Sequence, residues 1–116
     1  MGNSYRDLIV WQRAIQMTLA VYKATEDFPS RELYGLSSQL RRAAVSVASN
    51  IAEGYSRMST GEYKQFLGMA RGSNAEVQTQ LVIAKGLNMG NPENLESANG
   101  LSEEVHKMIC AILKKL

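Results

Sequence analysis

The chain has 116 residues, of which 45% are apolar and 21% charged, a balance typical of a globular protein that can bury one core. Its net charge of +2 is too small to indicate a nucleic-acid-binding protein by itself. A single cysteine excludes an intrachain disulfide, and no apolar run approaches the roughly 20 residues that cross a bilayer. We therefore expect a cytoplasmic protein without membrane contact, folded as one domain over residues 1–116.

The first predicted helix covers about residues 7–27 and carries two apolar stripes. One stripe contains Leu8, Trp11, Ile15, Leu19 and Tyr22, and the other contains Val10, Ala14, Met17 and Val21. At 100° per residue the two stripes point about 130° apart. Because a helix that is apolar over more than half of its circumference needs more than one partner, we expect an oligomer interface on this helix.

The second predicted helix covers about residues 31–55. Proline at position 29 ends the preceding helix, since it disfavours helical geometry at the residue before it, and Ser30 is expected to cap the new helix. Its apolar seam is Leu33, Leu36, Leu40, Ala44, Val47 and Ile51. Alanine and serine dominate residues 43–52, so a neighbouring helix axis can approach closely. Gly54 suits the end of this helix.

The third predicted helix covers about residues 60–87. Ser59 followed by Glu62 is a capping-box pattern, which predicts a helix start near residue 60. Cations or an amide recur every seven residues on one face, at Lys64, Arg71, Gln78 and Lys85. Gly68 and Gly72 form a GxxxG pattern, which we interpret as a close crossing with another helix.

The fourth predicted helix covers about residues 92–115. Asn91-Pro92 is a favourable cap and first-position pair, and an apolar seam from Leu95 to Leu116 follows it. The connections between the four helices are short, so consecutive helices are expected to be antiparallel neighbours. The predicted fold is all-α, an antiparallel up-down-up-down four-helix bundle.

Catalytic and metal-binding patterns are weak. Glu103-x-x-His106 has the spacing of a di-iron motif, but such a site needs two of these motifs and two further glutamates, and the chain has one histidine. Cys110 falls within the apolar pattern of its helix, which is typical of a core thiol. We therefore expect no enzymatic activity, no metal and no cofactor.

A polar stripe runs along the second predicted helix and has two interpretations. Asn50 and Glu53 could form a recognition surface together with Arg42 and Arg57. Alternatively they form an internal network, in which Glu53 pairs with an arginine or another helix and Asn50 fixes register. Glu76 on the third helix allows the same two interpretations.

The positive charge is concentrated in the middle of the chain. Residues 41–85 contain six Lys or Arg against three acids, whereas residues 1–40 are balanced. The candidates for phosphate contacts are Arg41, Arg42, Arg57, Lys64, Arg71 and Lys85, of which Arg57 and Lys64 flank a turn and are expected to be the most exposed. Phosphate backbones are bound by such cations when they share a surface. A solvated face with internal salt bridges is the alternative interpretation.

Several segments carry a resemblance to a known family. They are Trp11-Gln12, the linker from Phe28 to Leu36, SNIAEG at residues 49–54 and ARGSNAEVQTQL at residues 70–81. The chain resembles the small bacterial four-helix-bundle proteins encoded by intervening sequences in large-subunit ribosomal RNA genes. It departs from the family at Ala48, where proline is usual, and at Gln78, where glutamate is usual.

The resemblance implies a homopentamer arranged as a ring. The fold is also similar to that of the accessory protein of diversity-generating retroelements, which binds nucleic acid and a reverse transcriptase. Together with the basic residues, this leads us to expect a non-enzymatic protein that binds nucleic acid, structured RNA more than DNA, as a homo-oligomer. The alternative is an oligomeric scaffold that recruits a partner protein and has no role with nucleic acid.

Overall fold

The computed structural model describes residues 4–116, so the first three residues of the predicted domain lie outside the described part. It contains α1 (Ile9–Thr25), α2 (Leu36–Tyr55), α3 (Thr60–Gly86) and α4 (Pro92–Lys115), with two short 3₁₀ turns, η1 (Tyr5–Asp7) and η2 (Ser30–Glu32). The predicted all-helical bundle is confirmed, and residues 4–116 contain no strand. None of the helices in this part of the chain is both long and apolar enough to span a membrane.

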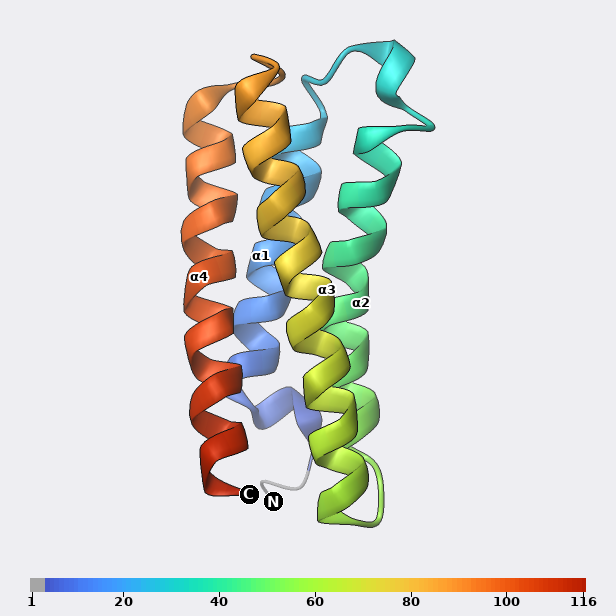
Figure 1. Ribbon diagram of the computed structural model, residues 1–116, viewed down its shortest axis with the longest axis vertical. Helices are drawn as coiled ribbons and strands as arrows, with labels where there is room; N and C mark the ends of the chain where they lie inside the picture. Colours follow the sequence, from blue (N-terminus) through green and yellow to red (C-terminus); the bar gives the residue numbers. More distant parts are fainter. Residues whose placement is uncertain (1–3) are drawn as a thin grey trace.

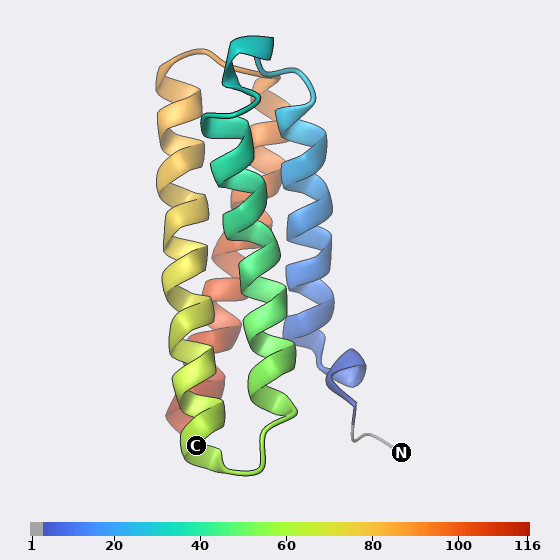
Figure 2. The same cartoon turned by 90° about the vertical axis from the view of Figure 1, so that its right-hand side faces the viewer.

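The helices form an elongated bundle of 43 × 24 × 23 Å in which each helix runs antiparallel to the next (Figure 1). α2 packs against α1 and α3, and α4 packs against the same two helices from the other side (Figure 2). α1 and α3 therefore lie diagonally across the bundle from each other. Any surface carried by the outer side of α3 is remote from the outer side of α1.

The start of α2 differs from the sequence prediction. Residues 30–32 form a separate 3₁₀ turn, and α2 begins only at Leu36. The backbone N–H of Leu36 donates to the Glu32 carboxylate at 3.0 Å, so Glu32 supplies the hydrogen bond that was expected from Ser30. The prediction that Ser30 caps this helix is wrong, because the turn that contains Ser30 ends before the helix begins.

The other helix starts follow local signals more closely. The Ser59 side chain accepts a hydrogen bond from the Glu62 N–H at 3.2 Å, and Asn91 Oδ1 accepts one from the Glu93 N–H at 2.8 Å. Both predicted caps are therefore confirmed. α1 begins at Ile9, two residues later than predicted, because η1 is a separate turn joined to α1 through the extended residue Leu8.

The core contains one of the two apolar stripes of α1 together with the seams of the other helices. Val10, Met17 and Val21 are buried, as is Leu40 of α2. One polar pair lies among these side chains. Asn74 Nδ2 donates to the Ser102 carbonyl and the Ser102 hydroxyl donates to Asn74 Oδ1, both at 2.8 Å. Because a buried polar group is costly without a partner, this pair fixes the register of α3 against α4.

The tightest packing in the bundle is that of α2 against α3. A Cβ atom at Gly54 would lie 2.6 Å from the Cβ of Phe66. Gly54 lies inside α2, one residue before its last residue, and serves close packing, whereas the C-cap of the helix is Ser56. By contrast, no atom lies within 4 Å of a Cβ at Gly68 or Gly72. The interpretation of GxxxG as a close crossing is therefore wrong.

We predict that Gly54→Ala lowers the free energy of unfolding by about 1–3 kcal/mol, since the added methyl group forces α2 and α3 apart. Gly68→Ala is the matched control. It adds the same methyl group in open space within the same bundle and is expected to raise stability by about 0.5–1 kcal/mol. Urea unfolding followed by circular dichroism measures both. Equal effects of the two substitutions would contradict the close approach at Gly54.

Candidate nucleic-acid interface

Three of the predicted cations form a row along α3. Lys64, Arg71 and Lys85 are exposed, and Gln78 continues their seven-residue spacing. At 1.5 Å per residue the row is about 32 Å long. None of the three cations makes an ion pair or hydrogen bond with any residue between 4 and 116. We call these three cations the basic row.

The basic row lies on the flank of α3 that faces α4. On α3, Ser73 points to α2, where its hydroxyl lies 2.9 Å from that of Ser46, and Asn74 points to α4. Arg71 lies three residues before Asn74, and Gln78 lies four residues after it. At 100° per residue, both therefore lie on the side of Asn74 that points away from Ser73 and α2. At the end of the row, Lys85 lines a cleft together with residues of α4, among them Glu96.

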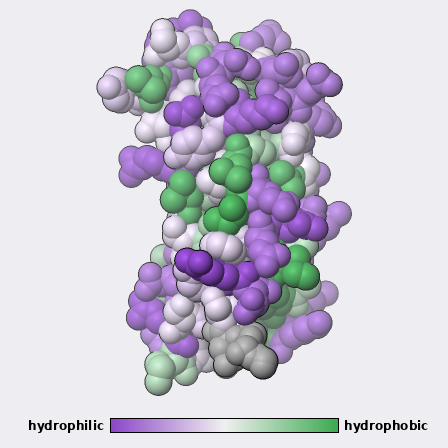
Figure 3. Space-filling model, turned by 180° about the vertical axis from the view of Figure 1, so that it is seen from behind, coloured by the Kyte–Doolittle hydropathy of each residue, from purple (hydrophilic) through white to green (hydrophobic). Residues whose placement is uncertain are grey.

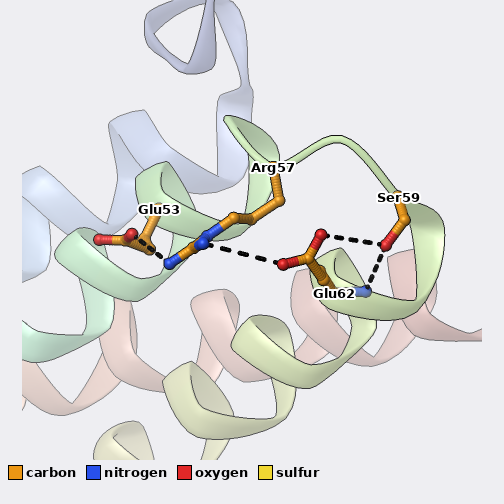
Figure 4. A network of polar contacts seen from close by, with 4 residues as sticks. All are labelled: Glu53, Arg57, Ser59 and Glu62. Carbon is orange, nitrogen blue, oxygen red and sulfur yellow. Dashed lines mark hydrogen bonds and ion pairs between the residues drawn. The ribbon is translucent and has the colours of Figure 1, made fainter.

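Arg57 is placed differently, at the turn between α2 and α3. Its guanidinium lies 2.8 Å from the Glu53 carboxylate and 3.7 Å from that of Glu62 (Figure 4). It also stacks over the Phe66 ring at 4.9 Å. The network interpretation of Glu53 is therefore confirmed. Arg57 was expected to be among the most exposed cations, and it is exposed. Two carboxylates nevertheless already balance its charge.

A tyrosine pair supports the same turn. The rings of Tyr55 and Tyr63 pack edge to face with centroids 5.7 Å apart. Burial raises the pKa of the Tyr63 phenol above its ordinary value, and the neighbouring Tyr55 raises it further. The phenol therefore remains neutral at physiological pH and acts as packing support for the end of α2.

Arg41 and Arg42 are neighbours in sequence but face different helices. Arg41 Nε donates to the Thr25 hydroxyl at 2.8 Å, and its guanidinium stacks over the Tyr22 ring at 4.9 Å, which ties α2 to α1. Arg42 is exposed on the α3 side of α2 and makes no ion pair with any described residue. The six predicted cations thus do not share one surface, and the three on α3 are the ones that lie together.

A polar groove between α2 and α3 was not predicted from the sequence. It has a volume of about 320 Å³ and is lined by Gln39, Arg42, Ala43, Ser46, Glu76 and Gln80. On each helix, the polar residues of the groove are three or four residues apart, which is about one helical turn. The groove could therefore have been predicted by pairing the polar stripe of α2 with that of α3. We call this feature the α2–α3 groove.

A second groove, of about 280 Å³, lies between α1 and α2 and is mainly apolar. Its lining includes Trp11, Ile15, Val45 and Ala48. Beside it, Leu19 leaves 65% of its surface exposed. The face opposite to that of Figure 1 shows apolar atoms gathered at its centre (Figure 3). One of the two apolar stripes of α1 is therefore partly uncovered in the single chain.

The residues considered for metal binding or nucleophilic chemistry do not form a larger cluster. His106 Nε2 lies 3.6 Å from Cys110 Sγ, one turn away on α4. Within residues 4–116, no three His, Cys, Asp or Glu side chains come together in a group that could hold a metal ion.

A family model described as 23S rRNA-intervening sequence protein matches residues 6–111, which include almost all of the four helices. The chain belongs to this family. The intervening-sequence protein fold is also seen in a crystal structure from Bacteroides thetaiotaomicron, of a protein with unknown function from the S23 ribosomal protein family. The two share 22% sequence identity with a TM-score of 0.81, over 91% of this chain and 99% of the other. At this identity the likeness shows the fold alone. No curated protein matches the chain.

Proposed function

We propose that this chain is a cytoplasmic, non-enzymatic protein that forms a ring-shaped homopentamer and binds nucleic acid, structured RNA in preference to DNA. The observation that carries the proposal is the basic row, whose three cations are exposed and unpaired within residues 4–116. The three cations lie along one flank of a single helix, and binding of phosphates by Lys and Arg gains free energy from the release of condensed counterions.

Oligomerisation would strengthen this weak basic surface. Three cations on one chain bind a phosphate backbone only weakly, but a ring repeats the row on every subunit. Once one subunit is bound, the others contact the same nucleic acid at a high effective concentration. A modest charge per chain then gives a useful affinity for the whole assembly.

The partly uncovered stripe of α1 supports an assembly of several copies. Trp11, Ile15 and Leu19 expose apolar surface beside the apolar groove against α2, and covering it removes that surface from water. A ring forms when this patch on one copy meets a different patch on the next and the rotation closes. The family resemblance supports closure with five copies.

RNA is the favoured nucleic acid because the family is described by its link to a ribosomal RNA intervening sequence. A row of cations without an aromatic side chain between them suits contacts to phosphate and sugar more than stacking on bases. Binding through the row alone is therefore expected to be strongly dependent on salt and only weakly dependent on sequence.

The alternative function is an oligomeric scaffold that recruits a partner protein. Its support is the connection between α1 and α2, where Tyr34 is 94% exposed and Leu33 is 51% exposed. Tyrosine is among the residues most enriched at the energetic centres of protein interfaces, and the exposed Leu33 adds apolar surface beside it. Recruitment through them would be insensitive to ionic strength, which separates this function from phosphate binding.

We predict that Leu19→Glu shifts the assembly toward monomer, because it places a charge on apolar surface that neighbouring copies would bury. Val82→Glu is the control, since Val82 is equally exposed but lies on α3. Sedimentation velocity at micromolar concentration measures the mass of each protein. A wild-type protein that sediments as a monomer would contradict the proposed assembly.

We predict that the double variant Lys64→Glu/Arg71→Glu loses most of its affinity for a labelled RNA stem-loop. The control is Lys23→Glu/Arg31→Glu, which makes the same change in charge on exposed residues of α1 and η2. Fluorescence anisotropy over a series of salt concentrations gives each affinity. The slope of log affinity against log salt concentration should also be smaller in magnitude for the double variant, by about two for each bound chain.

The control variant should retain most of the wild-type affinity, because Lys23 lies on α1, diagonally opposite α3, and Arg31 lies on η2, which does not pack against α3. Unchanged affinity in the Lys64→Glu/Arg71→Glu protein, or an equal loss in both variants, would exclude the basic row as the binding surface. Absence of RNA binding by the wild-type protein at low salt would favour the scaffold function.

A further inference from the structure

The α2–α3 groove contains hydrogen-bonding groups that the fold leaves unused. Arg42 and Glu76 both line it, yet neither makes an ion pair or hydrogen bond with any residue between 4 and 116. The side-chain oxygen of Gln80, Oε1, is buried and has no donor among the described residues. The groove therefore combines an unused guanidinium, an unused carboxylate and a buried amide oxygen.

The buried oxygen of Gln80 is the most informative of these groups. A buried acceptor without a donor is unfavourable, and most such atoms in folded proteins have a partner. The hydroxyl of Ser46, which also lines the groove, lies 2.9 Å from that of Ser73 and makes no hydrogen bond with Gln80 Oε1. Because Gln80 lines the groove, a rotation of its amide would bring this oxygen to the groove surface, where a ligand that donates a hydrogen bond would satisfy it.

The groove groups define the chemistry of that ligand. Glu76 and Gln80 Oε1 both accept, so the ligand needs several N–H groups along one edge. Arg42 only donates, so the ligand also needs acceptors on an adjoining edge. Among the nucleobases, guanine alone presents an imino N1–H beside an N2 amino group, with O6 and N7 as neighbouring acceptors. Adenine and cytosine offer one amino group, and uracil offers one imino N–H.

We propose that the α2–α3 groove binds an unpaired guanine of the nucleic acid. Glu76 accepts from N1–H and N2–H, Gln80 accepts from the second N2 hydrogen, and Arg42 donates to O6 or N7. This inference rests on the proposed nucleic-acid function and adds a base-specific contact to the sequence-independent row. Unpaired bases in loops and bulges are the usual targets of sequence-specific RNA recognition.

The position of the groove fits a strand that also contacts the basic row. The groove lies on the α2 flank of α3, and Lys64, Arg71 and Lys85 lie on the α4 flank. One helix width, about 10–12 Å, separates the two flanks. A strand that crosses the outer face of α3 can therefore place phosphates on the row and a base in the groove.

The test uses the full chain and a fluorescent 12-nucleotide RNA of uridines with one variable central base. We expect the probe with guanine to bind about tenfold more tightly than probes with adenine, cytosine or uracil, as for one good bidentate base contact. Inosine lacks the N2 amino group but retains N1–H and O6, so the inosine probe should fall between guanine and adenine.

Two variants locate the contact. Glu76→Gln and Gln80→Leu should each reduce the affinity for the guanine probe to that for the adenine probe. Glu93→Gln and Gln65→Leu are the matched controls on exposed positions of α4 and α3, and they should leave the guanine preference unchanged. Thermal unfolding by circular dichroism verifies that each variant is folded. Because the two groove variants remove different acceptors, each tests the guanine contact independently of the other.

The outcomes separate this inference from the proposed function. Salt-dependent binding with equal affinity for all probes would overturn the guanine site and leave the basic row intact. A guanine preference that survives in both Glu76→Gln and Gln80→Leu would also overturn it. This includes the case in which these two variants alter the mass of the assembly but not the preference for guanine. Absence of binding to every probe at low salt would overturn the site and the proposed function together.

Discussion

The close approach of α2 to α3 is the constraint on which the rest of the structure depends. Only glycine fits at position 54 against Phe66, and the small residue Ala43 lies farther along this face of α2. Because the two helices are close together, the polar stripe of α2 and that of α3 line the same groove, the α2–α3 groove. The same contact presents the opposite flank of α3, with its cations, toward α4.

The distribution of charge follows from this packing more than from the net charge of +2. Arg41 and Arg57 are held by Thr25 and by Glu53 and Glu62, and both guanidinium groups stack on aromatic rings, so they join helices to one another. The three cations of the basic row, on the α4 flank of α3, have no such partners within the described residues. Arg41 and Arg57 thus stabilise the bundle, and the unpaired positive charge on α3 is confined to Lys64, Arg71 and Lys85 on one flank.

The sequence predicted what depends on neighbouring residues along the chain. Helical periodicity and the caps at Ser59 and Asn91 located α3 and α4 to within a residue, since these signals act over one turn. Tertiary contacts decided the rest. The role of Glu32 at the start of α2, the open surroundings of Gly68 and the contact of Arg57 with Glu62 were not predicted, because they depend on how the backbone and side chains are placed in the folded chain. The α2–α3 groove was missed for the same reason.

The central claim is that nucleic acid lies along the basic row, on the α4 flank of α3, and a site-specific crosslink tests it most directly. A photoreactive benzoylphenylalanine in place of Gln78 would sit between Arg71 and Lys85, and the same residue in place of Gln16 on α1 is the reference. After irradiation with a labelled RNA stem-loop, we predict a crosslink from position 78 and little from position 16. Equal crosslinking at the two positions, or crosslinking from position 16 alone, would contradict binding along α3.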